Sequence, residues 1–401
     1  MKPVPGGITA PEGFLAAGAS IGIKKSRRKD LALILTRSIS SAAGVFTTNR
    51  VKAAPVLISQ KQIKEGIAQA IVINSGNANC STGEKGMRDA SRMVTETAAA
   101  LRVSPHHVLV ASTGTIGVPM PIDTIIKGIW ALAPKVSRDG GMDAAEAIMT
   151  TDKMIKEAAF EIPLKKGQVM RIGGMAKGSG MIDPKMATMI AVITTDANIR
   201  TTLLRKILLQ VTEKTFNCLS IDGDRSTNDT VFSLANGLSK TQEIVEFSDE
   251  YDLFVEAFEA VCLGLSRDIA RDGEGATRFL EIHVNGAKTE EDAVLVAKRL
   301  VTSARVKTAV HAADPNWGRL LAAAGSSGVA IVPEKITVSV GPVKLVQKGE
   351  GVKFDAAKVR KLLHQKEVLF SVDLGLGAKS GRAFGCDLSA DYVAINAKYH
   401  T

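Results

Sequence analysis

The chain has 401 residues, of which 45% are hydrophobic and 23% are charged, as in ordinary globular proteins. Lysine and arginine together number 51 and aspartate and glutamate 41, so the formal net charge is +10. Only 4% of the residues are aromatic, too few for the stacking surfaces of proteins that bind single-stranded nucleic acid. We therefore expect a site for an anionic metabolite and no nucleic-acid partner.

The cysteine spacing and the apolar segments indicate in which cellular compartment the protein is expected. The four cysteines lie far apart without a CxxC pair, which fits neither a zinc site nor a disulfide scaffold. The basic run KKSRRK at 24–29 follows the first apolar segment, the reverse of a secretory signal, and is interpreted as a solvated loop or hairpin end. No apolar run approaches the roughly 18 residues of a membrane span. We expect a cytoplasmic protein without membrane association.

Short apolar runs bounded by turn-forming residues predict buried strands in the first part of the chain. These runs cover residues 70–73, 108–111 and 186–193. Helical periodicity alternates with them and predicts helices over 86–102, 201–216 and 250–271. Alternating strands and helices indicate an α/β (α+β) protein.

The pattern restarts near residue 280. A strand at 279–284 meets an Asn285-Gly286 turn, and Thr289 with Asp292 three residues later predicts a capped helix through about residue 303. A further strand is predicted at 306–312.

This restart predicts two lobes. The large lobe covers 1–278, and a smaller α/β lobe covers 279–401.

Several familiar ligand motifs are excluded by spacing. The glycine-rich stretch 173–180 has the order Lys-Gly-Ser, which is not the phosphate-loop order, and no dinucleotide fingerprint follows a strand. The acidic loop 220–230 lacks the glycine and glutamate of a calcium loop, because Thr227 and Ser233 stand at those positions. No Gly-x-Ser-x-Gly elbow occurs. We expect no metal and no cofactor.

Thr188 stands inside the apolar run, next to Ala187 and behind several glycines. A threonine in such a run is ordinarily a packed strand residue. Alternatively, breaking the peptide bond before it would free an α-amine with a pKa near about 8, which could serve as the base for its own hydroxyl. The small residues before it would permit the strained geometry of that cut. Composition alone leaves both readings open and favours the first.

The segment KGSGMIDPKMATMIAVITTDA at 177–197 resembles the self-cleavage region of the ornithine acetyltransferase (ArgJ) family. Two departures from the usual family pattern are Cys80-Ser81 and the charged Asp183-Pro184-Lys185. Further segments similar to the family are spread along the whole chain. They are 7–14, 73–80, 111–117, 220–230, 272–278, 314–319 and 392–401.

The resemblance implies a self-processing enzyme. The precursor is expected to cut itself between Ala187 and Thr188, which gives an α chain of residues 1–187 and a β chain of residues 188–401. It further implies an N-terminal-nucleophile type αββα sandwich core and an α₂β₂ heterotetramer.

The same resemblance implies the reaction, a ping-pong transfer of acetyl from N-acetylornithine to Thr188 and then to glutamate. The oxyanion hole would consist of the Thr113 hydroxyl and the Gly114 backbone N–H. A second donor, acetyl-CoA, is left open. The implied substrate-binding residues are Thr151, Lys177, Thr188, Glu274, Asn396 and Thr401.

Two alternatives share parts of this pattern. An N-terminal-nucleophile aminopeptidase or amidase would have the self-cleaving core but would pass the acyl group to water. A non-enzymatic basic binding protein would remain an intact chain and bind polyanions in a salt-dependent way.

Replacing the nucleophile tests the processing hypothesis. Thr188→Ala should leave one uncut chain and abolish acetyl transfer, because both steps need the same hydroxyl. A denaturing gel with N-terminal sequencing follows the cut, and an acetyl-transfer assay follows the reaction. Transfer by the variant would rule out Thr188 as the nucleophile.

Overall fold

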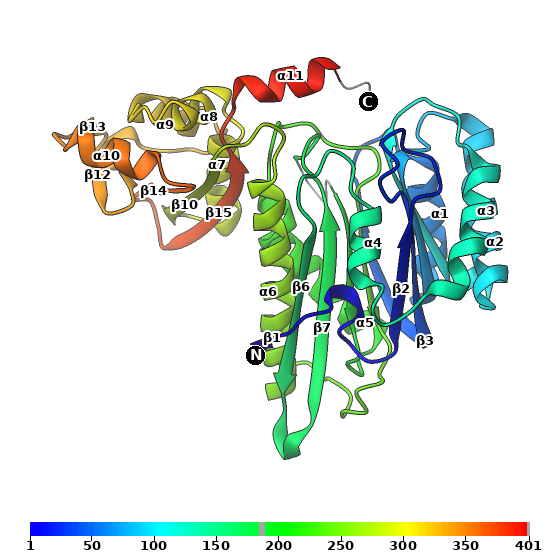
Figure 1. Ribbon diagram of the computed structural model, residues 1–401. Helices are drawn as coiled ribbons and strands as arrows, with labels where there is room; N and C mark the ends of the chain where they lie inside the picture. Colours follow the sequence, from blue (N-terminus) through cyan, green and yellow to red (C-terminus); the bar gives the residue numbers. More distant parts are fainter. Residues whose placement is uncertain (184–188, 399–401) are drawn as a thin grey trace.

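The computed structural model describes residues 1–183 and 189–398 of this chain. Within these residues the fold is mixed α/β and contains two separate sheets, of nine and six strands. The two sheets lie in two lobes that stand side by side (Figure 1). No helix of the described residues is long and apolar enough to cross a bilayer.

The nine-stranded sheet has the order β1-β6-β7-β8-β9-β3-β4-β5, with β2 paired to β3. Its strands are β1 (Lys2–Pro3), β2 (Phe14–Ala19), β3 (Leu31–Phe46), β4 (Ile67–Asn77), β5 (Val108–Thr115), β6 (Lys156–Pro163), β7 (Val169–Lys177), β8 (Ile190–Thr195) and β9 (Thr230–Ala235). The strands predicted at 70–73 and 108–111 are confirmed as parts of β4 and β5. Of the strand predicted at 186–193, the part up to Thr188 lies outside the described residues.

The long strand β3 folds this sheet into two halves. Its first part, from Leu31, pairs with β4 and its last part pairs with β9, and the register shifts between Leu35 and Ser40. The two halves meet again beyond β3. The side-chain amide of Asn228, just before β9, donates to the backbone carbonyl of Ser112 in β5 at 2.8 Å. The β2–β5 half therefore faces the β6–β9 half.

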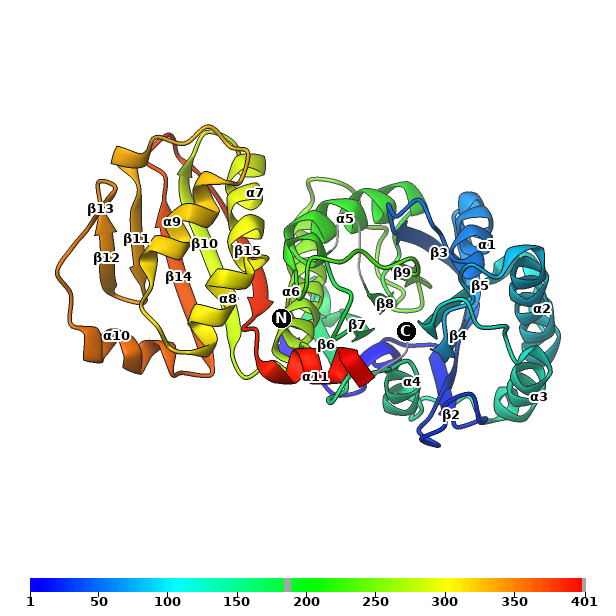
Figure 2. The same ribbon diagram turned by 90° about the horizontal axis from the view of Figure 1, so that it is seen from above.

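Helices cover the outer faces of both halves (Figure 2). They are α1 (Ala54–Gln62), α2 (Gly83–Leu101), α3 (Ile122–Leu132), α5 (Thr201–Lys214) and α6 (Asp249–Arg271), whereas the short α4 (Gly141–Ala147) contributes Ala144, Ala145 and Ala147 to the core between the halves. The helices predicted at 86–102, 201–216 and 250–271 are thus confirmed as α2, α5 and α6.

Three layers of buried apolar side chains define the sandwich. One core joins α5 and α6 to the β6–β9 half, another joins α2 and α3 to the β2–β5 half, and a third lies between the halves. Ile73 of β4 and Val192 of β8 share that middle core. The strands β8 and β9, whose residues are all buried, are mostly apolar, as expected for strands that are covered on both faces. This is the expected αββα arrangement.

The six-stranded sheet begins at Phe279 and has the order β13-β12-β11-β14-β10-β15. Its strands are β10 (Phe279–Ala287), β11 (Thr337–Val340), β12 (Val343–Gln347), β13 (Glu350–Gly351), β14 (Glu367–Asp373) and β15 (Lys379–Cys386). The helices of this part of the chain are α7 (Glu290–Val301), α8 (Ala304–His311), α9 (Trp317–Gly325), α10 (Ala356–Leu363) and α11 (Ala390–Lys398). Helix α11 leaves the small lobe and crosses the top of the large one (Figures 1 and 2).

Two local predictions in this lobe were wrong. Residues 306–312 are not a strand, because Ser303 caps helix α8 by accepting from the N–H of Val306, and Val306 and Val310 then share one buried helical face. The Asn285-Gly286 pair does not end β10 but forms an irregularity within it. The capped helix from Thr289 is confirmed as α7.

The basic run at 24–29 lies in the connection between β2 and β3, as expected for a hairpin end. It is not simply solvated, however. Lys24, Arg28 and Lys29 are half-buried, whereas Lys25 and Arg27 are exposed.

An aromatic pair joins the lobes. Phe279 of β10 stacks on Phe384 of β15 with ring centroids 6.3 Å apart, and the guanidinium of Arg267 in α6 lies 5.9 Å from both centroids. Both rings are buried. Apolar burial and cation–π contact therefore fix the small lobe against α6.

Phe384→Ala should lower the free energy of unfolding by about 3–5 kcal/mol, the usual cost of emptying a buried phenylalanine site. Phe247→Ala is the matched control, because the Phe247 side chain is 88% exposed. Urea unfolding of both variants measures the effect. Equal midpoints for the two variants would show that the pair does not hold the lobes together.

Candidate active site

The ends of β5 and β7 meet at a cavity of about 230 Å³. The loop 222–229 and helix α11 complete its walls. Among the described residues that line it, one lysine, Lys177, stands against four carboxylates. These are Asp222, Asp224, Asp229 and Glu274.

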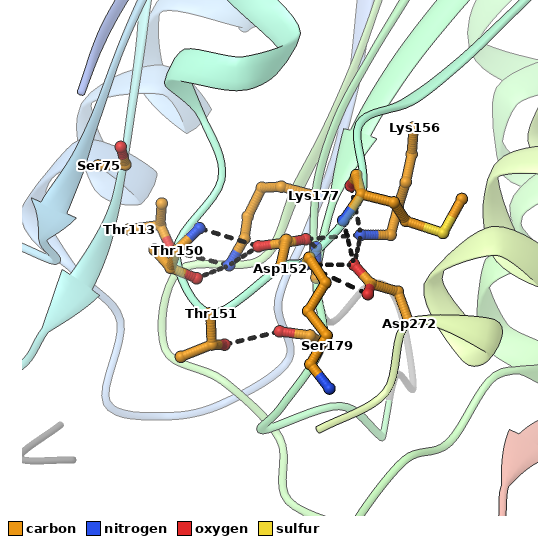
Figure 3. A network of polar contacts seen from close by, with 12 residues as sticks. Ser75, Thr113, Thr150, Thr151, Asp152, Lys156, Lys177, Ser179 and Asp272 are labelled. Carbon is orange, nitrogen blue, oxygen red and sulfur yellow. Dashed lines mark hydrogen bonds and ion pairs between the residues drawn. The ribbon is translucent and has the colours of Figure 1, made fainter. Parts of the chain in front are cut away.

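Lys177 is the last residue of β7, and its side chain points across the cavity wall (Figure 3). The ammonium donates to the hydroxyls of Thr150 at 2.7 Å and Thr113 at 3.3 Å, and lies 4.0 Å from a carboxylate oxygen of Asp152. Burial lowers the pKa of Lys177, Asp152 opposes this, and Lys156 adds to it. A buried cation with an incomplete carboxylate contact is well suited to receive an anionic substrate group.

Behind Lys177 lies a buried ion network (Figure 3). The Lys156 ammonium contacts Asp152 at 2.8 Å and Asp272 at 2.6 Å, and all three side chains are almost fully buried. Asp152 also accepts from the backbone N–H groups of Thr150 at 2.9 Å and Gly178 at 2.6 Å. Burial alone would raise the pKa of Asp152, but the ammonium groups of Lys177 and Lys156 hold it below its usual range.

At the end of β5, Gly114 has a φ of +129°, a backbone conformation that is strained for any residue with a Cβ. An added Cβ would lie 2.4 Å from the backbone carbon of Gly76 and 2.5 Å from the nitrogen of Asn77. The neighbouring Thr113 hydroxyl accepts from Lys177, so its own proton is free to be donated elsewhere. A hydroxyl donor on a rigid strand end is what an oxyanion requires.

The opposite wall carries Glu274, which is buried and follows α6. Its carboxylate accepts from the side-chain amide of Asn396 in α11 at 2.9 Å, and its backbone N–H donates to the backbone carbonyl of Ser179 at 2.8 Å. The Ser179 hydroxyl in turn contacts that of Thr151 at 2.6 Å. These contacts tie α11 to the large lobe at the cavity.

Asp222 secures the segment that precedes the expected cut. Its carboxylate accepts from the backbone N–H groups of Met181 at 2.6 Å and Ile182 at 2.8 Å, and from the hydroxyl of Tyr392 in α11 at 3.4 Å. Burial raises the pKa of Asp222 despite these bonds. Downstream, the ammonium of Lys298 in α7 contacts Asp183 at 2.8 Å. The chain is therefore fixed up to residue 183 by groups that come later in the sequence.

The sequence model of the ArgJ family matches residues 15–401. This chain belongs to the ArgJ family. The arginine biosynthesis bifunctional protein ArgJ of Symbiobacterium thermophilum is 48% identical over all of both chains. That of Bacillus anthracis is 45% identical over 99% of this chain and 97% of its own.

Among solved structures, the arginine biosynthesis bifunctional protein argJ of Bacillus halodurans is similar, with a TM-score of 0.52 and 41% identity. The match covers 53% of this chain and 100% of that chain.

The residues that family resemblance assigns to substrate and oxyanion binding come together in this ArgJ chain. Those within the described residues all line the one cavity, and they are Thr113, Gly114, Thr151, Lys177, Glu274 and Asn396. Ala187, Thr188 and Thr401 lie outside the described residues. The individual roles of these residues remain predictions.

Sequence reasoning missed the supporting groups Asp152, Lys156, Asp222 and Asp272. No strand was predicted around Lys156, and nothing in the spacing pairs it with Asp272, 116 residues away. Within residues 1–183 and 189–398, no group of three or more His, Cys, Asp or Glu side chains is placed to hold a metal ion.

Gly114→Ala should lower kcat by about 10²–10³, the usual cost of losing one oxyanion donor, because the new Cβ must displace backbone at Gly76. Gly117→Ala is the matched control. Gly117 also has a positive φ, +77°, but nothing lies within 4 Å of its added Cβ. Steady-state kinetics of both variants measures the effect, and similar losses would show that backbone strain alone is responsible.

Proposed function

We propose that this chain is a self-processing glutamate N-acetyltransferase of arginine biosynthesis, which moves acetyl from N-acetylornithine to glutamate. The observation that carries the proposal is the single cavity in which Lys177, Glu274 and the Thr113-Gly114 strand end face one another. Such a cavity offers a cation for a carboxylate, a carboxylate for an amine, and donors for an oxyanion.

Recognition follows from these charges. The Lys177 ammonium receives the α-carboxylate that N-acetylornithine and glutamate share. The Glu274 carboxylate, held by Asn396, pairs with the free amine of N-acetylornithine. The further carboxylates at Asp222, Asp224 and Asp229 make the cavity favourable for a cationic side chain.

The chemistry requires the amine of a new N-terminus. The Thr188 hydroxyl oxygen attacks the acetyl carbonyl, and its proton passes to the Thr188 α-amine. The Thr113 hydroxyl and the Gly114 N–H stabilise the oxyanion. The C–N bond then breaks, the α-amine returns the proton to the leaving nitrogen, and ornithine departs. The glutamate amine attacks the acetyl ester by the same steps in reverse.

The length of a solved relative supports the cut. The Bacillus halodurans chain is matched over its whole length by 53% of this chain, which is about 213 of 401 residues. A β chain of residues 188–401 would have nearly that length. The contacts of Asp222 and Lys298 with residues 181–183 would keep the two products associated after cleavage. We further propose an α₂β₂ assembly in the cytoplasm, with no cofactor.

Glu274→Gln tests substrate recognition. The variant keeps the shape of the side chain but removes the charge, so the KM for N-acetylornithine should rise about tenfold or more. The exposed Glu334→Gln serves as the control.

The reaction itself is tested by incubating the protein with N-acetylornithine and glutamate and measuring N-acetylglutamate by mass spectrometry. Formation of N-acetylglutamate with equimolar ornithine is expected. Free acetate without N-acetylglutamate would instead identify a hydrolase, and no turnover with an intact chain would favour a binding protein.

A further inference from the structure

The connection between β2 and β3 is an ordered basic loop. Its base is the buried Asp30, whose carboxylate accepts from the backbone N–H groups of Ile21 at 2.7 Å, Ile23 at 2.7 Å and Lys24 at 3.0 Å. The Lys24 ammonium closes the loop by donating to the carbonyl of Lys29 at 2.6 Å. Five of the six residues from 24 to 29 are basic, so a rigid frame presents a concentrated positive charge.

This basic loop, residues 24–29, adjoins the wall of the active-site cavity. Lys24 packs on Gly76, because a Cβ there would lie 3.1 Å from its Cγ, and Gly76 in turn packs against the oxyanion residue Gly114. Arg28 donates to the backbone carbonyl of Asp152 at 3.3 Å. In Figure 1 the loop lies at the upper end of the large lobe, the end that α11 crosses.

The positive charge of the loop is only partly neutralised within the chain. Lys29 contacts Asp143 at 2.6 Å and Glu146 at 2.7 Å, both in α4. The charged side-chain groups of the other four basic residues form no ion pair within 4.0 Å among the described residues. Burial, together with Arg28 and Lys177, lowers the pKa of Lys24 to about 8 against the opposing effect of Asp30. The cations of the loop repel one another, and a bound anion would reduce this repulsion.

The cavity interior has the opposite character. Four carboxylates line it, so a multiply charged phosphate would be repelled from the position that the substrate amine takes. An acyl donor that carries phosphates must therefore place its acyl end in the cavity and its phosphates outside. Outside the cavity, the basic loop offers such phosphates a positively charged surface next to the cavity wall.

We propose that the basic loop 24–29 is a phosphate-binding subsite beside the active site, which takes the phosphate groups of an acyl-thioester donor such as acetyl-CoA. The proposal rests on the proposed acetyl transfer and adds a second class of donor to it. In that step the Thr188 oxygen forms the ester while the acyl C–S bond breaks. The hydroxyl proton passes through the α-amine to the departing thiolate, so the products are the acetyl-enzyme and a free thiol.

The test uses the mature full-length protein with Lys25→Gln and Arg27→Asn combined. Both side chains are exposed, and asparagine tolerates the positive φ of 56° at position 27. The matched control is Lys358→Gln with Lys361→Gln, which removes the same charge from α10 of the small lobe. Calorimetry measures binding of desulfo-coenzyme A, which carries the phosphates but no thiol, and of phosphate-free pantetheine.

We expect the loop variant to bind desulfo-coenzyme A about fivefold more weakly than the wild type and the control, with a smaller salt dependence. Pantetheine binding and the KM for N-acetylornithine should be unchanged. Equal binding of desulfo-coenzyme A by all three proteins, or none by any, would overturn the subsite. Loss of RNA-oligonucleotide binding in the variant without a change for desulfo-coenzyme A would also overturn it and assign the loop to a polyanion surface.

The outcome for the donor is separate from that for the proposed function. If N-acetylornithine transfer fails while desulfo-coenzyme A binding depends on the loop, the proposed function is wrong and the subsite stands. If transfer from N-acetylornithine proceeds but desulfo-coenzyme A does not bind, the subsite is wrong and the proposed function stands.

Discussion

The buried ion network around Lys156 is the constraint on which the site depends. A lysine and two aspartates removed from water are stable only if each charge is paired and hydrogen-bonded, and breaking one pair would leave an uncompensated buried charge. Asp152 and Lys156 lie at the start of β6, whereas Asp272 follows α6 and is 116 residues away, so pairing these charges fixes the start of β6 against the end of α6. Lys177, on the neighbouring strand, is held against the same network at the cavity wall.

The cavity and the basic loop carry charges of opposite sign, and each sign suits a different ligand group. Inside the cavity one ammonium faces several carboxylates, which suits an amino acid with a cationic side chain. Outside, the basic loop carries cations whose own carboxylate partners are few. Two donors of different charge could therefore deliver the same acetyl group to one nucleophile from different directions.

The sequence predicted the regular elements well where one periodicity dominated. The apolar stripe of α6 indicated a helix, and the short buried runs of β4 and β5 indicated strands. Residues 306–312 misled because valine favours strands, whereas the Ser303 cap and the i, i+4 spacing of Val306 and Val310 favour a helix. The sharp fold of the sheet at β3 also has no local signal, because it arises from contacts between distant strands.

The candidate site was predictable mainly through family resemblance. Lys177 and Glu274 were assigned a role through the resemblance alone, because their burial depends on the tertiary fold. The basic run at 24–29 was visible in the sequence, but its contacts with Gly76 and Asp152 were not. Local patterns report periodicity and capping, whereas partners that are distant in sequence are fixed only by the folded chain.

In the proposed reaction, an N-terminal threonine carries the acetyl group between two amino acids. Intact-mass spectrometry of the protein mixed with N-acetylornithine alone tests this most directly. We expect a β chain that begins at Thr188 and gains about 42 Da, one acetyl group, which is lost again when glutamate is added. An uncut chain, or an acetyl group that stays on the protein after glutamate is added, would contradict the proposed reaction.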